Sequence, residues 1–321
     1  MDPRFITPAN NHSEAVVDES SNQKGRYGAD FIDFLSVLHQ FNCERLIERK
    51  VPGTLPFQVL TSKVVDFVFH ICSRMNLPTE VKYVALEIFD RFCVHHFTDL
   101  WEHTCEVSCD EYQQMKVWKR ITSRSQKQAL LRAISSIQIA SKFVLQSNCL
   151  TVKDVQEYLN KWGHAYNLHS IHLSEIRVFS TIGCKVPLYS MFDFTRTFLE
   201  GLQYWSDVDE LYPTCEKVLE VAFLQRDEIY LRFFWMGTSR WHHSRQERLQ
   251  FAEIEVNNLF FGASIVVCSV YIHQLEGLGP NEASRILSEL SHISSSDITA
   301  LAVVIAQLIS GTRTVRFKAC E

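Results

Sequence analysis

The sequence predicts an all-α protein made of two successive five-helix bundles preceded by an N-terminal helix. Apolar residues recur at helical spacing along most of the chain, and a similar order of helices occurs twice. The 321 residues include only 11 glycines and 8 prolines, which strand-and-turn architectures need at many connections. Because 46% of the residues are hydrophobic, the chain has enough apolar material for substantial cores.

The N-terminal part divides into a polar arm and a helix. Residues 1–28 contain few large apolar side chains, so we expect a disordered arm. Residues 29–50 carry Phe31, Phe34 and Phe41 at helical spacing, which predicts a helix with an aromatic face. We expect that face to belong to a core, with packing across a partner as the alternative.

The first bundle is expected over residues 51–186. Thr151 followed by Asp154 is typical of a capping box, and the small residues of 128–145 would let neighbouring helices approach closely. That segment is therefore the expected central helix. The five expected helices run from about Phe57 to Met75, from Thr79 to Phe92, from Gln128 to Leu145, from Val152 to Trp162 and from His169 or Ser170 to Gly183.

Residues 94–127 differ in composition from the segments on either side. Histidines, cysteines and acids come first and a basic run follows, so we interpret this stretch as a long, partly helical insertion. Its side chains of zinc-ligand type are His95, His96, His103, Cys105 and Cys109. Their spacing matches no common structural zinc site, so no metal is expected.

The second bundle is expected over residues 187–311, with 312–321 as a short tail. Its expected helices are Phe192 to Leu202, Pro213 to Phe234, Leu259 to Leu275, a short one capped by Asn281 and a last one capped by Ser296. We interpret residues 237–248 as a solvated polar linker, with contact between its histidines and arginines and a phosphate or acidic partner as the alternative. In both bundles the third helix is rich in small residues, which suggests an internal duplication.

Charge and cysteine usage point to an intracellular protein with protein partners. The formal net charge is −5, so the whole molecule is not predisposed to hold a polyanion, and no sequence-specific nucleic-acid binding is expected. Cys72, Cys184 and Cys268 lie in apolar runs without a CxxC pair, as free buried thiols do in a reducing compartment. Gly262 and two serines interrupt the apolar run 259–272, which favours a buried helix, and we expect no membrane partner.

The sequence contains no motif typical of an active site. It lacks a glycine-rich phosphate loop, a GxSxG elbow and an HExxH pair, and acid pairs such as Asp209 and Glu210 fall in polar connections. We therefore expect a protein that is not an enzyme and uses no cofactor.

Three short blocks carry a resemblance to a known family. They are Val65-Asp66-Phe67-Val68 with Asp90-Arg91-Phe92, Ala140-Ser141-Lys142-Phe143, and Glu175 followed by Val178-Phe179. Over about residues 57–187 this order resembles the first cyclin box, and the second bundle resembles the more divergent second box of cyclins. The resemblance implies a regulatory adaptor with the tandem cyclin-like fold.

The resemblance also assigns roles to single residues. In cyclins a lysine and a glutamate at the positions of Lys142 and Glu175 approach each other and bind the backbone around the regulatory helix of a kinase, and Phe143 lies beside them. Without the resemblance, a lysine and a glutamate on separate helices would be ordinary surface residues. The implied structural residues of the box are Asp66, Phe67, Asp90, Arg91, Phe92 and Ala140.

One departure from the family concerns substrate docking. Cyclins open the first box helix with Met-Arg-Ala-Ile-Leu, which binds short substrate motifs, whereas Leu60-Thr61-Ser62-Lys63-Val64 stands here. Docking of that kind is therefore not expected. The arginine of that patch normally pairs with the aspartate at the position of Asp90, so Asp90 needs other donors or water, because a buried unpaired carboxylate is costly.

Among cyclins, the resemblance is to members associated with meiotic recombination, where they promote crossover maturation. It implies a cyclin-dependent kinase and meiotic recombination proteins as partners, and a nuclear location with the cytoplasm as a second one. Two alternatives remain: a general kinase-activating subunit in cell-cycle control, and a cyclin-fold transcription adaptor. Such adaptors usually carry a zinc ribbon and basic surfaces, whereas only Cys43 precedes the first box and the chain is acidic.

Overall fold

The computed structural model describes residues 27–50, 60–107, 110–145, 147–238, 245–275 and 277–311, and these residues form helices and no strands. The all-α expectation is confirmed for them. The expected N-terminal arm, apart from Tyr27 and Gly28, and the expected tail lie outside the described residues.

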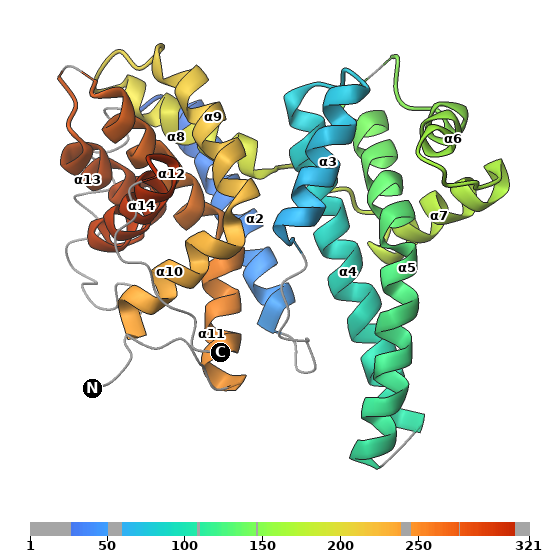
Figure 1. The fold of residues 1–321 in the computed structure, drawn as a ribbon. Helices are drawn as coiled ribbons and strands as arrows, with labels where there is room; N and C mark the ends of the chain where they lie inside the picture. The colour runs from blue at the N-terminus through green and yellow to red at the C-terminus, as the bar shows by residue number, and fades with distance from the viewer. Residues whose placement is uncertain are drawn as a thin grey trace. The chain divides into compact units, whose positions relative to one another are not determined.

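The chain forms two compact units. We call Val51–Ser190 the central unit, and Met1–Lys50 together with Met191–Glu321 the terminal unit. Within the described residues the central unit has five helices: α3 (Ser62–Arg74), α4 (Thr79–Val107), α5 (Glu111–Val144), α6 (Val152–Lys161) and α7 (Leu168–Thr181). Helix α5 packs against α3, α4 and α7, and α6 packs against α7 (Figure 1).

The inner half of α5 is the core of the central unit. Its side chains from Ala133 to Ser141 are all buried, and five of these nine residues are serine or alanine. This confirms the expected central helix. The capping box at the start of α6 is also confirmed, because the Thr151 hydroxyl accepts from the Asp154 amide and the Asp154 carboxylate accepts from the Thr151 amide.

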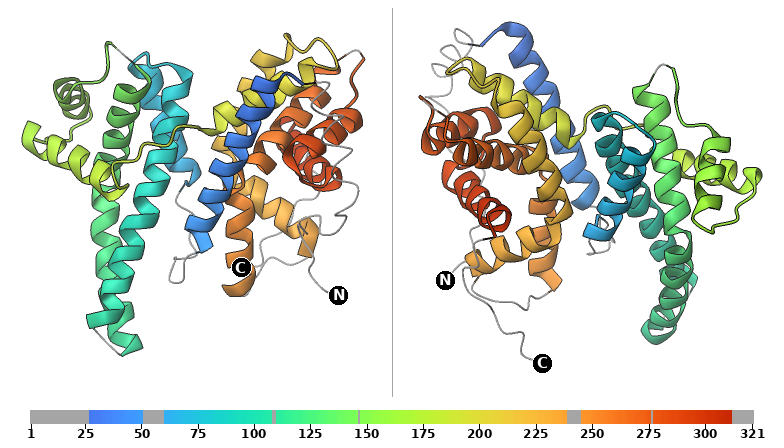
Figure 2. Two further views of the ribbon diagram at one scale, coloured as in Figure 1. Left: turned by 180° about the vertical axis from the view of Figure 1, so that it is seen from behind. Right: turned by 45° about the horizontal axis from the view of Figure 1, so that its top comes forward.

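The expected insertion is a pair of helical extensions. Helix α4 has 29 residues and α5 has 34, and both run through residues 94–127, which we call the hairpin extension. The two helices lie side by side beyond the ends of α3, α6 and α7 (Figures 1 and 2). The expected helix end at Phe92 and helix start at Gln128 were wrong, because apolar side chains continue at helical spacing between them. The Trp118 ring meets the rings of Trp101 and Phe97 at centroid distances of 5.1 and 6.0 Å.

The terminal unit is built around one buried helix. Its described helices are α2 (Ala29–Lys50), α8 (Met191–Gln203), α9 (Leu211–Leu224), α10 (Arg226–Thr238), α11 (Arg245–Val256), α12 (Asn258–His273), α13 (Pro280–Ser291) and α14 (Ser295–Ile309). Every residue from Asn258 to Val270 is buried, because α8, α9, α13 and α14 surround α12. No helix in the described part of the chain is long and apolar enough to cross a membrane.

The expected count of five helices in the second half was wrong. The segment 213–234 divides at Gln225 into α9 and α10, and α11 begins inside the expected linker. Buried Arg226 explains the division, because its guanidinium lies over the Phe261 ring at 4.9 Å and donates to the carbonyl of Glu255. The other residues of the linker, 239–244, lie outside the described residues.

Three helix starts also differ from expectation. Helix α7 is capped by Asn167, whose side chain accepts from the Ser170 amide at 2.7 Å, and not by His169 or Ser170. Helix α13 begins with Pro280 after Gly279, because proline needs no hydrogen-bond partner in the first turn. Helix α14 follows Ser294, so Ser296 lies within it.

Helix α2 docks on the terminal unit through its aromatic face. The Phe31 ring stacks on Tyr27 at 5.2 Å and meets Tyr204 at 5.6 Å. Gly201 of α8 makes this approach possible, because a Cβ there would lie 3.1 Å from the Phe31 ring and 2.6 Å from the Leu290 side chain. The core interpretation therefore holds for buried Phe41, whereas Phe31 and Phe34 are half-buried at the contact with α8.

Burial divides the cysteines into reactive and protected groups. Burial raises the pKa of the Cys72, Cys215 and Cys268 thiols to about 12, so almost no thiolate exists near neutral pH. Cys184 is exposed, which corrects the expectation that it is buried.

We predict that iodoacetamide at about pH 8 modifies the exposed Cys43, Cys105 and Cys184 in the native protein and spares the buried Cys72, Cys215 and Cys268. Peptide mass spectrometry measures this, and rapid modification of Cys215 before unfolding would contradict it.

The stability of the hairpin extension should depend on the ring contacts between α4 and α5. Trp118→Ala removes the contacts with Trp101 and Phe97, and the loss should be about 2 kcal/mol because Trp118 is only half-buried. Hydrogen exchange should become faster in residues 97–125 and stay unchanged in α7. Tyr112→Ala is the control, since that side chain is 73% exposed and should leave exchange unaltered.

Candidate functional site

The site begins with the close contact between α5 and α7. The Ser135 hydroxyl donates to the Ser174 hydroxyl at 2.7 Å, and the Arg132 guanidinium donates to the same hydroxyl at 2.8 Å. Both serines are buried, and their small size lets the helices approach closely. This contact fixes the position of α7 beside the inner half of α5.

The same contact brings Lys142 and Glu175 together. The Lys142 ammonium donates to Oε1 of Glu175 in an ion pair between the end of α5 and the middle of α7. The Glu175 side chain is only 11% exposed, whereas that of Lys142 is 43% exposed. The carboxylate is thus held inside the surface and the ammonium faces outward, where a partner can reach it.

An apolar surface surrounds this ion pair. Phe143 follows Lys142 on α5 and is 46% exposed, while on α7 Leu173, Ile176 and Phe179 are 50%, 48% and 38% exposed. We call Phe143, Ile176 and Phe179, together with Lys142 and Glu175, the α5–α7 surface, whereas Leu173 lies about 160° around α7 from Glu175. Exposed apolar groups beside a polar pair are typical of a protein-binding surface.

The remaining residues that the resemblance singled out are outside the α5–α7 surface, and they range from buried to exposed. Ala140 and Phe92 are buried, Phe67 and Arg91 are half-buried, and Asp66 is exposed. Asp90 is only 4% exposed and interacts with a neighbouring group. It therefore has a partner although Thr61 stands where cyclins carry the arginine.

A groove of about 620 Å³ lies where the first box helix begins. The start of α3 contributes Thr61, Lys63 and Val64, and the hairpin extension contributes one wall with Phe97, Trp118, Thr122 and Ser125. Its lining includes Lys63, His96 and Arg132 and no carboxylate. The hairpin extension therefore reshapes this region, and the charge of the lining disfavours a basic docking segment.

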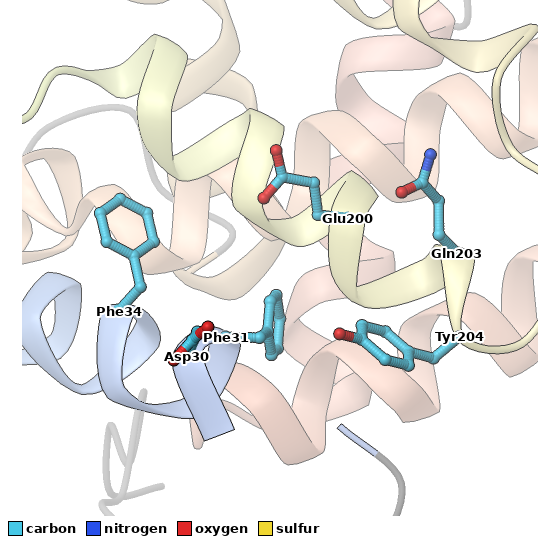
Figure 3. Close-up of a pocket in the computed structure, with 6 residues that line it drawn as sticks. All are labelled: Asp30, Phe31, Phe34, Glu200, Gln203 and Tyr204. Atoms are coloured by element: carbon cyan, nitrogen blue, oxygen red, sulfur yellow. The ribbon is translucent and has the colours of Figure 1, made fainter. Parts of the chain in front are cut away.

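A second hollow, of about 490 Å³, marks the junction of α2 and α8 in the terminal unit. Figure 3 shows its lining residues, which are Asp30, Phe31 and Phe34 from α2 and Glu200, Gln203 and Tyr204 at the end of α8. Its lining rings Phe31 and Tyr204 also dock α2. We assign it a packing role.

The residues of zinc-ligand type do not assemble. His95, His96, His103 and Cys105 lie along α4, and the described residues contain no group of three histidines, cysteines or acids placed to hold an ion. Instead, His96 stacks on Phe92 at 5.1 Å. Cys109 lies outside the described residues, as do the two histidines of the expected linker.

Removing either partner of the ion pair should destabilise the central unit, but the two losses should differ in size. Lys142→Met leaves the buried Glu175 carboxylate without its cation, whereas Glu175→Gln leaves a half-exposed ammonium that water can solvate. We predict a loss of about 2 kcal/mol for the first variant and about half that for the second. Urea unfolding of both variants measures the difference. A larger loss for Glu175→Gln would contradict the orientation described above.

Comparison with known proteins supports the resemblance. No family model matches the chain. Two similar proteins are cyclin N-terminal domain-containing protein 1 of Homo sapiens, 22% identical over 217 residues, and of Mus musculus, 20% identical over 218 residues. The aligned part covers 67% of this chain and 66% and 65% of those relatives, so the chain spans just under two thirds of their length. The chain is therefore similar to cyclin N-terminal domain-containing protein 1, which agrees with the resemblance seen in its motifs.

Proposed function

We propose that this protein is a cyclin-like regulatory or scaffold protein in meiotic recombination that promotes crossover maturation by binding a cyclin-dependent kinase, recombination proteins or both. The similarity to cyclin N-terminal domain-containing protein 1 supports the cyclin-like part of this proposal. The meiotic part and the nuclear location rest on the resemblance, and the proposal that the protein is not an enzyme rests on its lack of active-site motifs.

The Lys142–Glu175 ion pair is the observation that carries the kinase part. It lies on the α5–α7 surface, where the outward ammonium can donate hydrogen bonds to backbone carbonyls of a partner. The exposed Phe143, Ile176 and Phe179 side chains offer the apolar area that a stable interface needs at its centre.

Such a surface can regulate without chemistry of its own. A kinase is active only when its regulatory helix is positioned so that a lysine–glutamate pair of the kinase forms. A protein that binds this inward arrangement more tightly than the outward one shifts the population toward it. The binding free energy of the α5–α7 surface would therefore supply the regulation.

Charge reversal tests the proposal. Lys142→Glu and Glu175→Lys should each remove the associated kinase when the protein is isolated from meiotic tissue. The first variant reverses the charge that faces the partner, and the second places a cation beside Lys142 and opens the ion pair. The double variant restores the ion pair in reversed order and should recover stability but not kinase binding. This separates recognition from folding.

The matched controls lie on α6 in the same unit. Lys153→Glu and Glu157→Lys reverse exposed charges of the same types and should leave the associated kinase in place. If the kinase survived both charge reversals at Lys142 and Glu175, this mode of binding would be wrong. Kinase activity in the isolated complex, measured on the same samples, distinguishes activation from recruitment.

A further inference from the structure

Helix α5 has an unusual distribution of charge. Of its 34 residues only Glu111 is acidic, and no acid occurs from Tyr112 to Val144. Over the same stretch there are seven lysines and arginines, although the whole chain has a net charge of −5. The positive charge is concentrated in the hairpin extension.

Five of these cations share one face of α5. At about 100° per residue, Lys116, Lys119, Arg120, Arg124 and Lys127 fall within an arc of about 140°. All five are exposed, and none forms an ion pair with another residue that the structure describes. We call these five residues the basic stripe. It is about 16 Å long, at 1.5 Å per residue.

The acidic side chains of α4 in the hairpin extension lie away from the basic stripe. Asp99, Glu102 and Glu106 are exposed on the face of α4 that points away from the ring of Trp101, and Trp101 faces α5. On α5 the stripe likewise lies opposite Trp118. The contact between these rings therefore holds the acidic and basic faces on opposite sides of the helix pair.

Uncharged residues on the same face of α5 are also suited to phosphate. Tyr112, Gln113 and Ser123 lie between or beside the cations and are exposed, and hydroxyl and amide groups of these types donate to phosphate oxygens. The exposed apolar residues Met115 and Val117 lie on the flanks and not within the stripe. A face that offers only cations and hydrogen-bond donors fits a regular array of phosphates.

We propose that the basic stripe binds the phosphate backbone of duplex DNA without sequence specificity. The major groove of B-DNA, about 12 Å wide, admits a single α-helix, whereas the deep and narrow major groove of duplex RNA does not. The stripe is a projecting helix face, so it can lie along one groove and contact its phosphates. This surface is separate from the α5–α7 surface and goes beyond the proposed function.

The salt dependence of binding gives a quantitative test. If five cations each neutralise one phosphate, log K should fall with log salt concentration with a slope of about −4.5. Fluorescence anisotropy of a short labelled duplex, titrated with the full-length protein at several salt concentrations, measures this slope. A duplex of unrelated sequence should bind equally well.

Variants of the basic stripe test whether its cations cause the salt dependence of DNA binding. The triple variant Lys116→Gln, Arg120→Gln and Arg124→Gln leaves two cations, so the slope should fall to about −2 and the affinity should fall by more than about tenfold at low salt. Glutamine preserves helix propensity, and circular dichroism confirms that the helix remains. The matched control is Lys153→Gln, Lys161→Gln and Lys185→Gln, which changes the net charge equally at exposed positions of the same unit and should leave both quantities unchanged.

Three results would overturn the proposal. They are absence of DNA binding by the wild-type protein, an unchanged slope in the stripe variant, and stronger stripe-dependent binding of an acidic polypeptide such as poly-glutamate than of the duplex. The last result would assign the stripe to an acidic protein segment. Kinase association of the stripe variant, measured in parallel, should persist, so that failure here is distinguishable from failure of the proposed function.

Discussion

The close contact between α5 and α7 is the constraint on which the candidate site depends. Two buried serines, Ser135 and Ser174, let the backbones approach closely enough for a direct hydrogen bond between their hydroxyls. Only in that register does the Lys142 side chain reach Glu175 from the neighbouring helix. A larger residue at either serine would separate the helices and open the ion pair, although neither charged residue had changed. The geometry of the site is therefore a product of core packing.

The same helix connects two surfaces of different chemistry. The inner half of α5 is surrounded by neighbouring helices, and its last turn presents Lys142 and Phe143. Its outer half packs against α4, through rings such as Trp101 and Trp118, and presents the basic stripe. Because the helix is continuous from Glu111 to Val144, the buried half fixes the direction in which the outer half projects. The hairpin extension can therefore be a rigid feature without a large core of its own.

Local chemistry predicted much of the fold and the centre of the site. The capping box of Thr151 and Asp154 and the small residues of 128–145 act within one helix or at one contact, so the sequence alone was enough to place them. The resemblance then paired Lys142 with Glu175, which residue spacing could not do. The hairpin extension was missed because the change in composition at residue 94 outweighed the continuing helical spacing of Phe97, Trp101 and Trp118. The division at Gln225 was missed because no glycine or proline marks it.

The exposed apolar residues of α7 show why the rest of the site could not be predicted. Periodicity identifies which residues of a helix are apolar, but burial depends on which faces the neighbours cover. Helix α7 has more apolar positions than one face can hold: Ile171 and Val178 are fully buried, whereas Leu173, Ile176 and Phe179 remain exposed. A helix that is apolar nearly all round is normally surrounded by protein. Here α4, α5 and α6 cover only part of it, so the uncovered Ile176 and Phe179 form the area beside Glu175 that a partner would bury.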